Sequence, residues 1–558
     1  MEKVTRGIAL SAITLSIAAT PLPCYMTTAL AQETPAATAG QESAASWDAQ
    51  ARALAQKHQL DQALDAANKA VEMAPDNSEY LRTRIDIEVW DGRYTEAERD
   101  LKTLLARGED PKQLKRLAMV QSWANELDAS SETFDGYHAV APNDTDALLN
   151  HARIESWRGD YPKALALLDQ FRASGGDETV YREETAIILA WADRPDSSLA
   201  VSAGQVEAHP ESTKFLFGEA VALSRGQRYE ESFQRYDELV AKRPDGSDVK
   251  ELGRVLRTPF RPYVRGDVDY THDSDTIDKV FSQVGGGYHF GYDTEVTAGF
   301  RDHWLHADIG SGLERADGGE NINITEPYVG ISHVLLPSLK LGGEIGVATA
   351  SNSGGTEMTY KVEAAWRPVE TLRVNVRHDR RFHDVSPRAV SLNITREETA
   401  LGITYTPDLL WTLEAGGAYA SFSDGNDRTG GYVAARRAVL RTQEVNLDLG
   451  LSANISGFEH DLNNGYYDPD LLENYAALAY IYRKIDDDNG ISLVLSAGAQ
   501  RDDDMSGYNF AGNAIVHGYF GIFEDWLLEV KGGVSRGLSD QGSGYTAGTA
   551  GLSLTRRF

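Results

Sequence analysis

The chain has 558 residues, a formal net charge of −30 and one cysteine, Cys24. This length predicts more than one domain. The strong acidity argues against binding to nucleic acid, which requires basic patches. Because Cys24 lies in a segment that we expect to be removed, the sequence provides neither a disulfide framework nor a thiol catalyst.

The first residues have the pattern of a secretory signal peptide. Lys3 and Arg6 precede an apolar run over 7–19, and Ala29-Leu30-Ala31 provides a small-x-small cleavage site. We therefore expect residues 1–31 to be a signal peptide and residues 32–45, which are low in complexity, to be a flexible leader. No later stretch contains about 18 consecutive apolar residues, so we expect no helical membrane anchor.

Residues 46–255 have helical periodicity and an internal repeat. Gly-x-Tyr or Gly-x-x-Tyr recurs with tyrosines at 94, 161 and 229, which are 67 and 68 residues apart, or twice 34. About six units of this length, each a helix-turn-helix, resemble the tetratricopeptide repeat. The residues that carry this repeat signature are Tyr94, Ala97, Tyr161, Ala164 and Tyr229. Stacked units of this kind form a superhelix with a concave protein-binding groove.

From residue 259 to 558 the period changes to two. In Leu372-Arg-Val-Asn-Val-Arg-His-Asp, the apolar side chains alternate with polar ones, as successive side chains of a strand leave opposite faces. Sixteen such segments can be counted. Many are as long as the roughly 9–11 residues that a membrane-spanning strand needs. The sequence therefore predicts an N-terminal all-α solenoid followed by a 16-stranded antiparallel transmembrane β-barrel.

The connections between these strands are of two kinds. Long or polar ones such as 306–321, 382–393 and 458–474 alternate with short ones such as 292–293, 336–338, 367–369 and 407–408. An even strand number with short turns at one rim and long loops at the other is typical of bacterial outer-membrane barrels. A soluble β-sandwich or propeller also has many alternating strands, but it explains neither their length nor the two kinds of connection.

The end of the chain and one loop carry a family resemblance. Leu552, Leu554 and Phe558 lie on one face of the last strand and resemble the signal read by the outer-membrane insertion machinery; Arg556 departs from that pattern. Tyr466, Tyr467 and Pro469 resemble an element of outer-membrane exopolysaccharide exporters. The whole arrangement is similar to the family of tetratricopeptide-repeat export porins, and most similar to those for poly-β-1,6-N-acetylglucosamine.

The resemblance implies a polar lumen through which a sugar polymer passes. Strand-face alternation alone gives the candidates for the lumen and substrate path: Arg265, Asp267, Asp269, Lys361, Glu363, Arg373, Arg377, Asp379, Asp448, Glu529 and Lys531. A polymer that must advance requires numerous and individually weak contacts. The alternative is that each of these charges belongs to an ion pair that only stiffens the wall.

The sequence indicates no enzyme, no catalytic residue, no cofactor and no metal site. His378 and His383 would face opposite sides of a strand, and the acidic run 486–488 lacks the spacing and the terminal Glu of a calcium loop. No Gly-x-Ser-x-Gly or His-Glu-x-x-His element is present.

We therefore expect a protein of the cell outer membrane whose repeats lie in the periplasm. The leading hypothesis is a monomeric conduit for an exopolysaccharide that resembles poly-N-acetylglucosamine, with cellulose or another polymer as alternatives. The repeats would recruit periplasmic or inner-membrane proteins that synthesise or modify the polymer, and the barrel would contact outer-membrane lipid. A plugged barrel that anchors a periplasmic scaffold and a barrel enzyme acting on lipid or glycan are the competing hypotheses.

Overall fold

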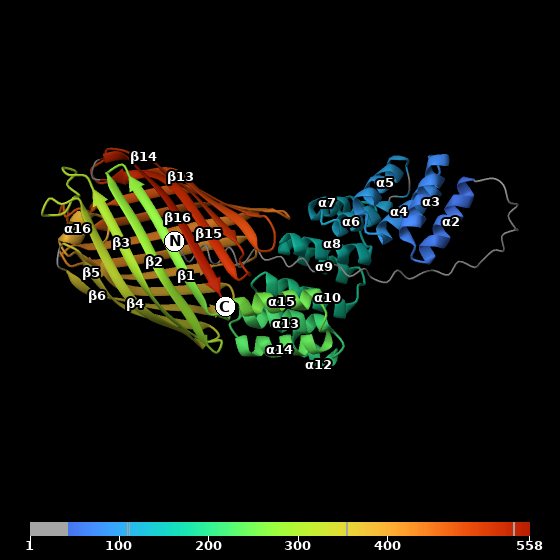
Figure 1. Ribbon diagram of the computed structural model, residues 1–558, viewed down its shortest axis with the longest axis horizontal. Coiled ribbons are helices and arrows are strands. Elements are labelled where there is room, and N and C mark those ends of the chain that lie inside the picture. Colours follow the sequence, from blue (N-terminus) through green and yellow to red (C-terminus); the bar gives the residue numbers. More distant parts are fainter. Residues whose placement is uncertain (1–42, 109, 111, 353–354, 540–541) are drawn as a thin grey trace. The chain divides into compact units, whose positions relative to one another are not determined.

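The computed structural model describes residues 43–558 except 109, 111, 353–354 and 540–541, and it consists of helical hairpins followed by a closed barrel (Figure 1). The expected signal peptide and most of the expected leader lie outside the described residues. Two compact units are present, one ending at Tyr181 and the other comprising Arg182–Phe558.

The helices form consecutive antiparallel pairs, as the 34-residue repeat predicts. None of the described helices is long and apolar enough to cross a membrane. Their bounds are α2 (Ala44–Gln56), α3 (Leu60–Met73), α4 (Ser78–Trp90), α5 (Tyr94–Ala106), α6 (Lys112–Trp123), α7 (Leu127–His138), α8 (Thr145–Arg158), α9 (Tyr161–Ala173), α10 (Glu178–Trp191), α11 (Pro195–Ser202), α12 (Gln205–Ala208), α13 (Thr213–Arg225), α14 (Tyr229–Lys242) and α15 (Ser247–Arg257).

Each pair is held together at one small, buried residue in its second helix. Tyr94, Tyr161 and Tyr229 are the first residues of α5, α9 and α14, and Ala97 and Ala164 are fully buried three residues later. In the first pair Ala63 of α3 occupies this position and is also fully buried. In three other pairs a serine occupies it and donates a hydrogen bond to a carbonyl of the first helix. These bonds run from Ser130 to Ala118, from Ser198 to Ala186 and from Ser232 to Ala220, at 2.6–2.7 Å. A larger side chain at this point would force the helices apart.

The fifth unit is shorter than the others, because its second helix, α11, has eight residues and the four-residue α12 follows it. Pro195 begins α11, where a missing N–H costs nothing. The weak repeat pattern of this part of the sequence therefore corresponds to a real shortening of the hairpin.

The sixteen strands form one closed antiparallel sheet, in which β1 pairs with both β2 and β16. All sixteen sequence segments correspond to strands. Their bounds are β1 (Tyr263–Asp273), β2 (Ile277–Phe290), β3 (Thr294–Ala307), β4 (Asn321–Leu336), β5 (Leu339–Ala350), β6 (Thr356–Val369), β7 (Leu372–Phe382), β8 (Thr395–Tyr405), β9 (Trp411–Phe422), β10 (Asp427–Arg441), β11 (Val445–Phe458), β12 (Leu472–Lys484), β13 (Asn489–Asp502), β14 (Asn509–Phe520), β15 (Trp526–Ser539) and β16 (Gly542–Arg557).

The outer face of the barrel is apolar and the inner face is polar. Exposed large apolar side chains alternate along the strands, as with Val264 and Val268 of β1 or Leu449 and Leu451 of β11. Aromatic residues such as Tyr270, Trp411 and Tyr475 are exposed on the outer face, but Tyr482 is only 6% exposed. It has the opposite parity to the exposed Tyr475 of the same strand, so Tyr482 faces inward and belongs to no outer girdle.

The two rims differ as the connections predict. Turns that follow even-numbered strands define the short-turn rim, and connections that follow odd-numbered strands define the long-loop rim, where 308–320, 383–394 and 459–471 are the longest. The turn expected at 367–369 lies at 370–371 instead, since β6 continues to Val369. The first strand begins at the short-turn rim, and the last strand ends there. At this point the Phe558 N–H donates to the Pro262 carbonyl at 2.9 Å.

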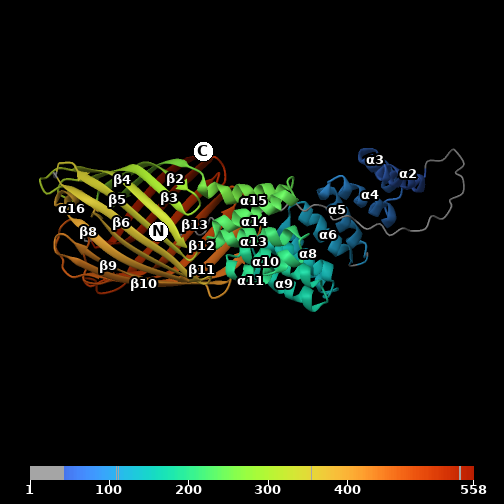
Figure 2. The same ribbon diagram turned by 90° about the horizontal axis from the view of Figure 1, so that it is seen from below.

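The last helices of the second unit pack on the short-turn rim (Figure 2). The ring of Phe233 in α14 stacks on Tyr292 of the β2–β3 turn at 4.4 Å between centroids. Arg194, just before α11, donates to the carbonyls of Thr406 and Asp408 at 2.9 and 2.7 Å. The final repeats are therefore attached to the barrel by aromatic and charged contacts and not by the chain alone.

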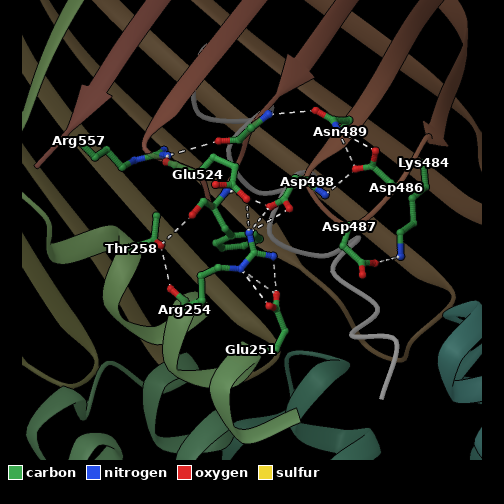
Figure 3. A network of polar contacts seen from close by, with 12 residues as sticks. Glu251, Arg254, Thr258, Lys484, Asp486, Asp487, Asp488, Asn489, Glu524 and Arg557 are labelled. Carbon is green, nitrogen blue, oxygen red and sulfur yellow. Dashed lines mark hydrogen bonds and ion pairs between the residues drawn. The ribbon is translucent and has the colours of Figure 1, made fainter. Parts of the chain in front are cut away.

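Arg254 of α15 is the centre of a second set of contacts at this rim (Figure 3). Its guanidinium lies 2.6 Å from Glu251, 2.8 Å from Asp488 and 3.0 Å from Glu524. Asp488 and Glu524 belong to the β12–β13 and β14–β15 turns. One side chain thus joins the last helix to two separate turns.

The outward face of β11 can be tested with a charge. We expect Leu451→Arg to destabilise the barrel by about 2–4 kcal/mol, because a guanidinium near the middle of the lipid layer is poorly solvated. Urea unfolding of the protein in lipid measures this loss. Ser452→Arg, one residue along on the inner face, is the control, and an equal loss in both variants would contradict the assignment of faces.

The Arg254 contacts can be tested without unfolding the barrel. Since a hydrogen bond to a charged group contributes about 1.5–3 kcal/mol, Arg254→Ala should loosen α15 from the rim and accelerate its amide hydrogen exchange about tenfold or more. The control is Lys250→Ala on the same helix, whose side chain is 65% exposed. Equal exchange in the two variants would show that α15 is held by other contacts.

Candidate functional site

The inner face near the short-turn rim carries a chain of ion pairs. Arg265 lies 2.8 Å from both Asp267 and Glu529, and Lys531 lies 2.7 Å from Asp269. The register explains the grouping, because β1 pairs with β16 and β16 with β15, and the inward side chains of all three strands meet. Five residues expected from strand parity are therefore brought together in one cluster.

A second group of charges lies nearer the long-loop rim. The Asp379 carboxylate is fully buried and contacts Arg377 and Arg381 at 2.9 Å and Arg396 at 3.4 Å. Glu398 beside it contacts Arg377 at 2.5 Å. A buried carboxylate is tolerated only with such partners, so this group fixes the wall where β7 and β8 meet.

The other predicted lumen residues lie apart from these two groups. Lys361 and Glu363 approach each other to 3.8 Å on β6, and Asp448 is 2.6 Å from Arg441. Arg373, at the short-turn end of β7, is paired with Asp193 before α11. Arg373 thus contributes to the attachment of the repeats and not to the interior of the lumen.

Sequence reasoning missed further inward charges. Arg301 of β3 makes two hydrogen bonds to Glu344 of β5, at 2.8 and 2.9 Å, and its guanidinium lies 3.7 Å from the ring centroid of Tyr328. Arg436 of β10 likewise pairs with Glu414 at 2.6 Å. Both arginines could have been found from the same alternation. Their partners could not, because they depend on which strands are neighbours.

The loop 383–394 folds against the inner wall at the long-loop end of the barrel and contains a short helix, α16 (Pro387–Ser391). Its Val390 is fully buried against inward residues of β3, β4 and β5, which include Leu305, Ile322 and Ile324. This apolar contact holds the loop against the inner wall, since removing such side chains from water is favourable. We refer to residues 383–394 as the lid.

A neighbouring loop, 459–471, locks the lid in place. The Ser386 hydroxyl donates to the Gly465 carbonyl at 2.5 Å, and Tyr466 packs with Ala389 and Ile394 in one buried cluster. The Tyr467 hydroxyl donates to Asp502 at 2.6 Å. The Pro469 carbonyl accepts from the Phe458 N–H at 2.9 Å. Tyr466, Tyr467 and Pro469 therefore lie at the long-loop rim, beside the lid.

His383, the first residue of the lid, contacts the rings of Phe422 and Tyr466 edge-on, each at 4.9 Å between centroids, and these two rings stack on each other. Burial lowers the pKa of His383 to about 3. The next residue, Asp384, accepts a hydrogen bond from His303 of β3 at 2.8 Å. An uncharged His383 is thus part of the closed arrangement.

The last strand presents its apolar side outward. Leu552, Leu554 and Phe558 are 52%, 44% and 66% exposed, as expected of residues facing lipid. The Arg556 guanidinium lies 2.9 Å from Asp525, and it also lies over two rings, 5.1 Å from the ring centroid of Trp526 and 5.7 Å from that of Phe558. A charge in this strand is therefore compensated at the rim. Whether Leu552, Leu554 and Phe558 serve as an insertion signal stays a prediction.

A closed sixteen-stranded barrel with an apolar outside, a charged inside and preceding helical repeats defines an outer-membrane β-barrel protein. Residues 339–509, from the start of β5 to the start of β14, match the family model described as the PgaA membrane beta barrel domain. This match confirms the resemblance to export porins with repeats and a barrel, and it confirms the outer-membrane location. The short-turn rim is the periplasmic rim, on the side where the repeats of this family lie, and the long-loop rim is extracellular.

No curated protein matches the chain. Among solved structures, a bacterial polysaccharide outer membrane secretin is 13% identical and covers 54% of this chain and 99% of its own, with a TM-score of 0.44. A tetratricopeptide repeat protein from Parabacteroides merdae is 14% identical and covers 39% of this chain and 86% of its own, with a TM-score of 0.36. OccK9 (OpdG) of Pseudomonas aeruginosa is 12% identical and covers 53% of this chain and 98% of its own, with a TM-score of 0.30.

The lid should respond to acid. Since the pKa of His383 lies below its ordinary value of 6.5, its neutral form stabilises the closed lid above pH 6.5, and this contribution is lost as the pH falls from 6.5 towards 3. We expect the single-channel conductance of the protein in planar lipid bilayers to be larger at about pH 4.5 than at about pH 7, and His383→Gln to remove most of the difference.

His378→Gln is the matched control, because His378 lies on the outer face of β7 and should leave the pH response intact. A conductance that does not change with pH, or that changes equally in the His383→Gln variant, would contradict the role of His383.

Proposed function

We propose that this chain is a conduit that exports an exopolysaccharide through the barrel, from the periplasmic rim to the extracellular rim. The observation that carries the proposal is the PgaA-type barrel domain, which forms part of a closed wall whose inner face is lined by charged groups. Transport through such a wall needs no catalytic residue. The barrel needs only to replace the water around the hydroxyl groups of each sugar and then to release that sugar again.

The charges of the inner face suit this task because most of them have partners. A lone carboxylate or ammonium would bind an opposite charge tightly, whereas a paired one offers weaker hydrogen bonds to many groups. The pairs Arg265–Asp267, Lys531–Asp269 and Arg301–Glu344 therefore favour a polymer of mainly neutral sugars that advances in small steps. We propose a polymer that resembles poly-N-acetylglucosamine, with cellulose and other exopolysaccharides as alternatives.

The repeats are the proposed docking site for periplasmic or inner-membrane proteins that synthesise or modify the polymer. Because the last repeats contact the periplasmic rim through Phe233, Arg194 and Arg254, a protein bound to them would be held near the mouth of the lumen. We propose the boundaries 46–255 for the repeats and 259–558 for the barrel; the change from helix to strand falls between Arg257 and Tyr263.

A barrel that only anchors a periplasmic scaffold is the second candidate, and the lid is the observation that favours it. Residues 383–394 lie against the inner wall at the extracellular end, where apolar contacts and Gly465 hold them. In an exporter the lid opens, whereas in an anchor it stays closed. The two functions therefore differ in whether current and polymer pass.

The export function is tested by polymer secretion in cells that lack the chain. We expect the polymer to remain in the periplasm and the cell surface to be bare, and we expect the full chain to restore secretion. Staining of intact cells and assay of the periplasmic fraction measure the two pools. Unchanged secretion in the cells that lack the chain would reject the export function.

A lid deletion tests whether the lid closes the lumen. Replacing residues 385–392 with a short Gly-Ser linker should raise the steady single-channel current several-fold, because it removes the apolar contacts that hold the lid against the inner wall. The control is a similar replacement of residues 505–507 in the β13–β14 loop, which should leave the current unchanged. An unchanged current after the lid deletion would show that the lid does not close the lumen.

A further inference from the structure

A cavity of about 380 Å³ lies at the periplasmic mouth of the lumen, at the place where the last helices meet the barrel wall. Inward residues of β1–β5 and β14–β16 form its wall together with Phe523 of the β14–β15 turn, and Tyr229 and Phe260 close it on the helical side. Its volume is within the range of pockets that hold small ligands, roughly 300–1,000 Å³. Neither the ion pairs of the lumen nor the attachment of the repeats requires such a space.

One wall of this cavity is an aromatic surface. Tyr263 of β1 lies flat against β2, because a Cβ at Gly287 would be 2.5 Å from its ring and glycine has none. The Tyr263 hydroxyl donates to Glu295 at 3.1 Å, which fixes the ring in this position. His289, Phe260 and Tyr519 also line the cavity. A tyrosine ring held in this way offers an apolar face to a ligand, and its hydroxyl group provides a polar contact at the edge of the ring.

Most of the charged groups around the cavity are satisfied by protein partners. Arg265 contacts Glu529 at 2.8 Å, Arg261 contacts Asp525 at 2.6 Å, and Arg557 donates to the Glu524 carbonyl at 2.8 Å. Side chains of both signs are present, so the cavity has no strong preference for an anion or a cation. A ligand that depends on its charge is therefore disfavoured.

Two neutral polar atoms of the same wall have no partner. Within the described residues, the Thr555 hydroxyl and the His289 Nδ1 are buried and make no hydrogen bond, and Thr555 is only 5% exposed. Thr555 lies between Arg265 and Leu527 in the register of β16 with its neighbours, and so faces the cavity. Buried polar groups are rarely left unsatisfied, and each such group is a reason to look for a ligand.

We infer that this cavity is a binding subsite for one or two sugar residues of a neutral glycan. A pyranose has apolar C–H faces that stack on aromatic rings, and hydroxyl or acetamido groups that can satisfy Thr555 and His289. Flat rings, satisfied charges and unsatisfied neutral polar atoms are the combination that a sugar ring complements. The inference rests on the proposed export function, in which the subsite holds the polymer as it enters the lumen.

Binding to the full-length protein in detergent micelles tests the subsite. The probe is a trisaccharide of β-linked N-acetylglucosamine, followed by saturation-transfer NMR and by titration. We expect weak binding, with Kd about 1 mM, since a transport subsite must release its ligand. Ser332→Trp, which fills the cavity from β4, should weaken binding more than about tenfold.

Thr555→Val is the second variant, because it keeps the shape of the side chain and removes only the hydroxyl. One lost hydrogen bond should weaken binding about three- to tenfold. Thr549→Val is its control: it lies on the same strand and the same face, and its hydroxyl is 3.4 Å from that of Thr271 and outside the cavity. Binding in this control should equal that of the unchanged chain.

Absence of trisaccharide binding by the unchanged chain, or equal binding in Ser332→Trp, Thr555→Val and Thr549→Val, would overturn the subsite. Secretion of polymer by a chain that binds no trisaccharide would reject the subsite and leave the export function in place. Specific binding by a chain that cells do not need for secretion would support the subsite and reject the export function.

Discussion

Inside a lipid layer the backbone has no water with which to form hydrogen bonds, and this constraint governs the whole second unit. A sheet meets it only when its first and last strands pair with each other. The pairing of Tyr263–Asp273 with the residues of β16 from Ala547 to Arg557 completes the closure here. Once the wall is closed, alternate side chains of each strand must face either lipid or lumen, and the positions of the charges on the strands follow from that choice.

The same constraint decided how much could be predicted from sequence. Alternation is a local property, so the sixteen strands, their two faces and the inward charges such as Asp267 and Glu529 could be found from the residues alone. The partner of each charge depends on the register between strands. Arg301 and Glu344 are 43 residues apart and on strands that are not adjacent, and no local pattern relates them.

Structure that forms by contact between distant segments was also beyond the sequence. The lid was expected only as a polar loop, but Val390 and Ala389 make it an apolar piece of the interior, because β3, β4 and β5 offer Leu305 and Ile322 on their inner faces. Arg373 was expected in the lumen by parity, and its parity is correct. Its position at the end of β7, beside Asp193, gives it a different partner.

The two turns that Arg254 contacts belong to the last five strands of the chain. Asp488 follows β12 and Glu524 follows β14, so α15 can be held by both only after the C-terminal strands have entered the sheet and closed on β1. A barrel that stalls before closure would leave Arg254 without its two partners in these turns. The joint between helix and barrel is therefore complete only when the barrel itself is complete.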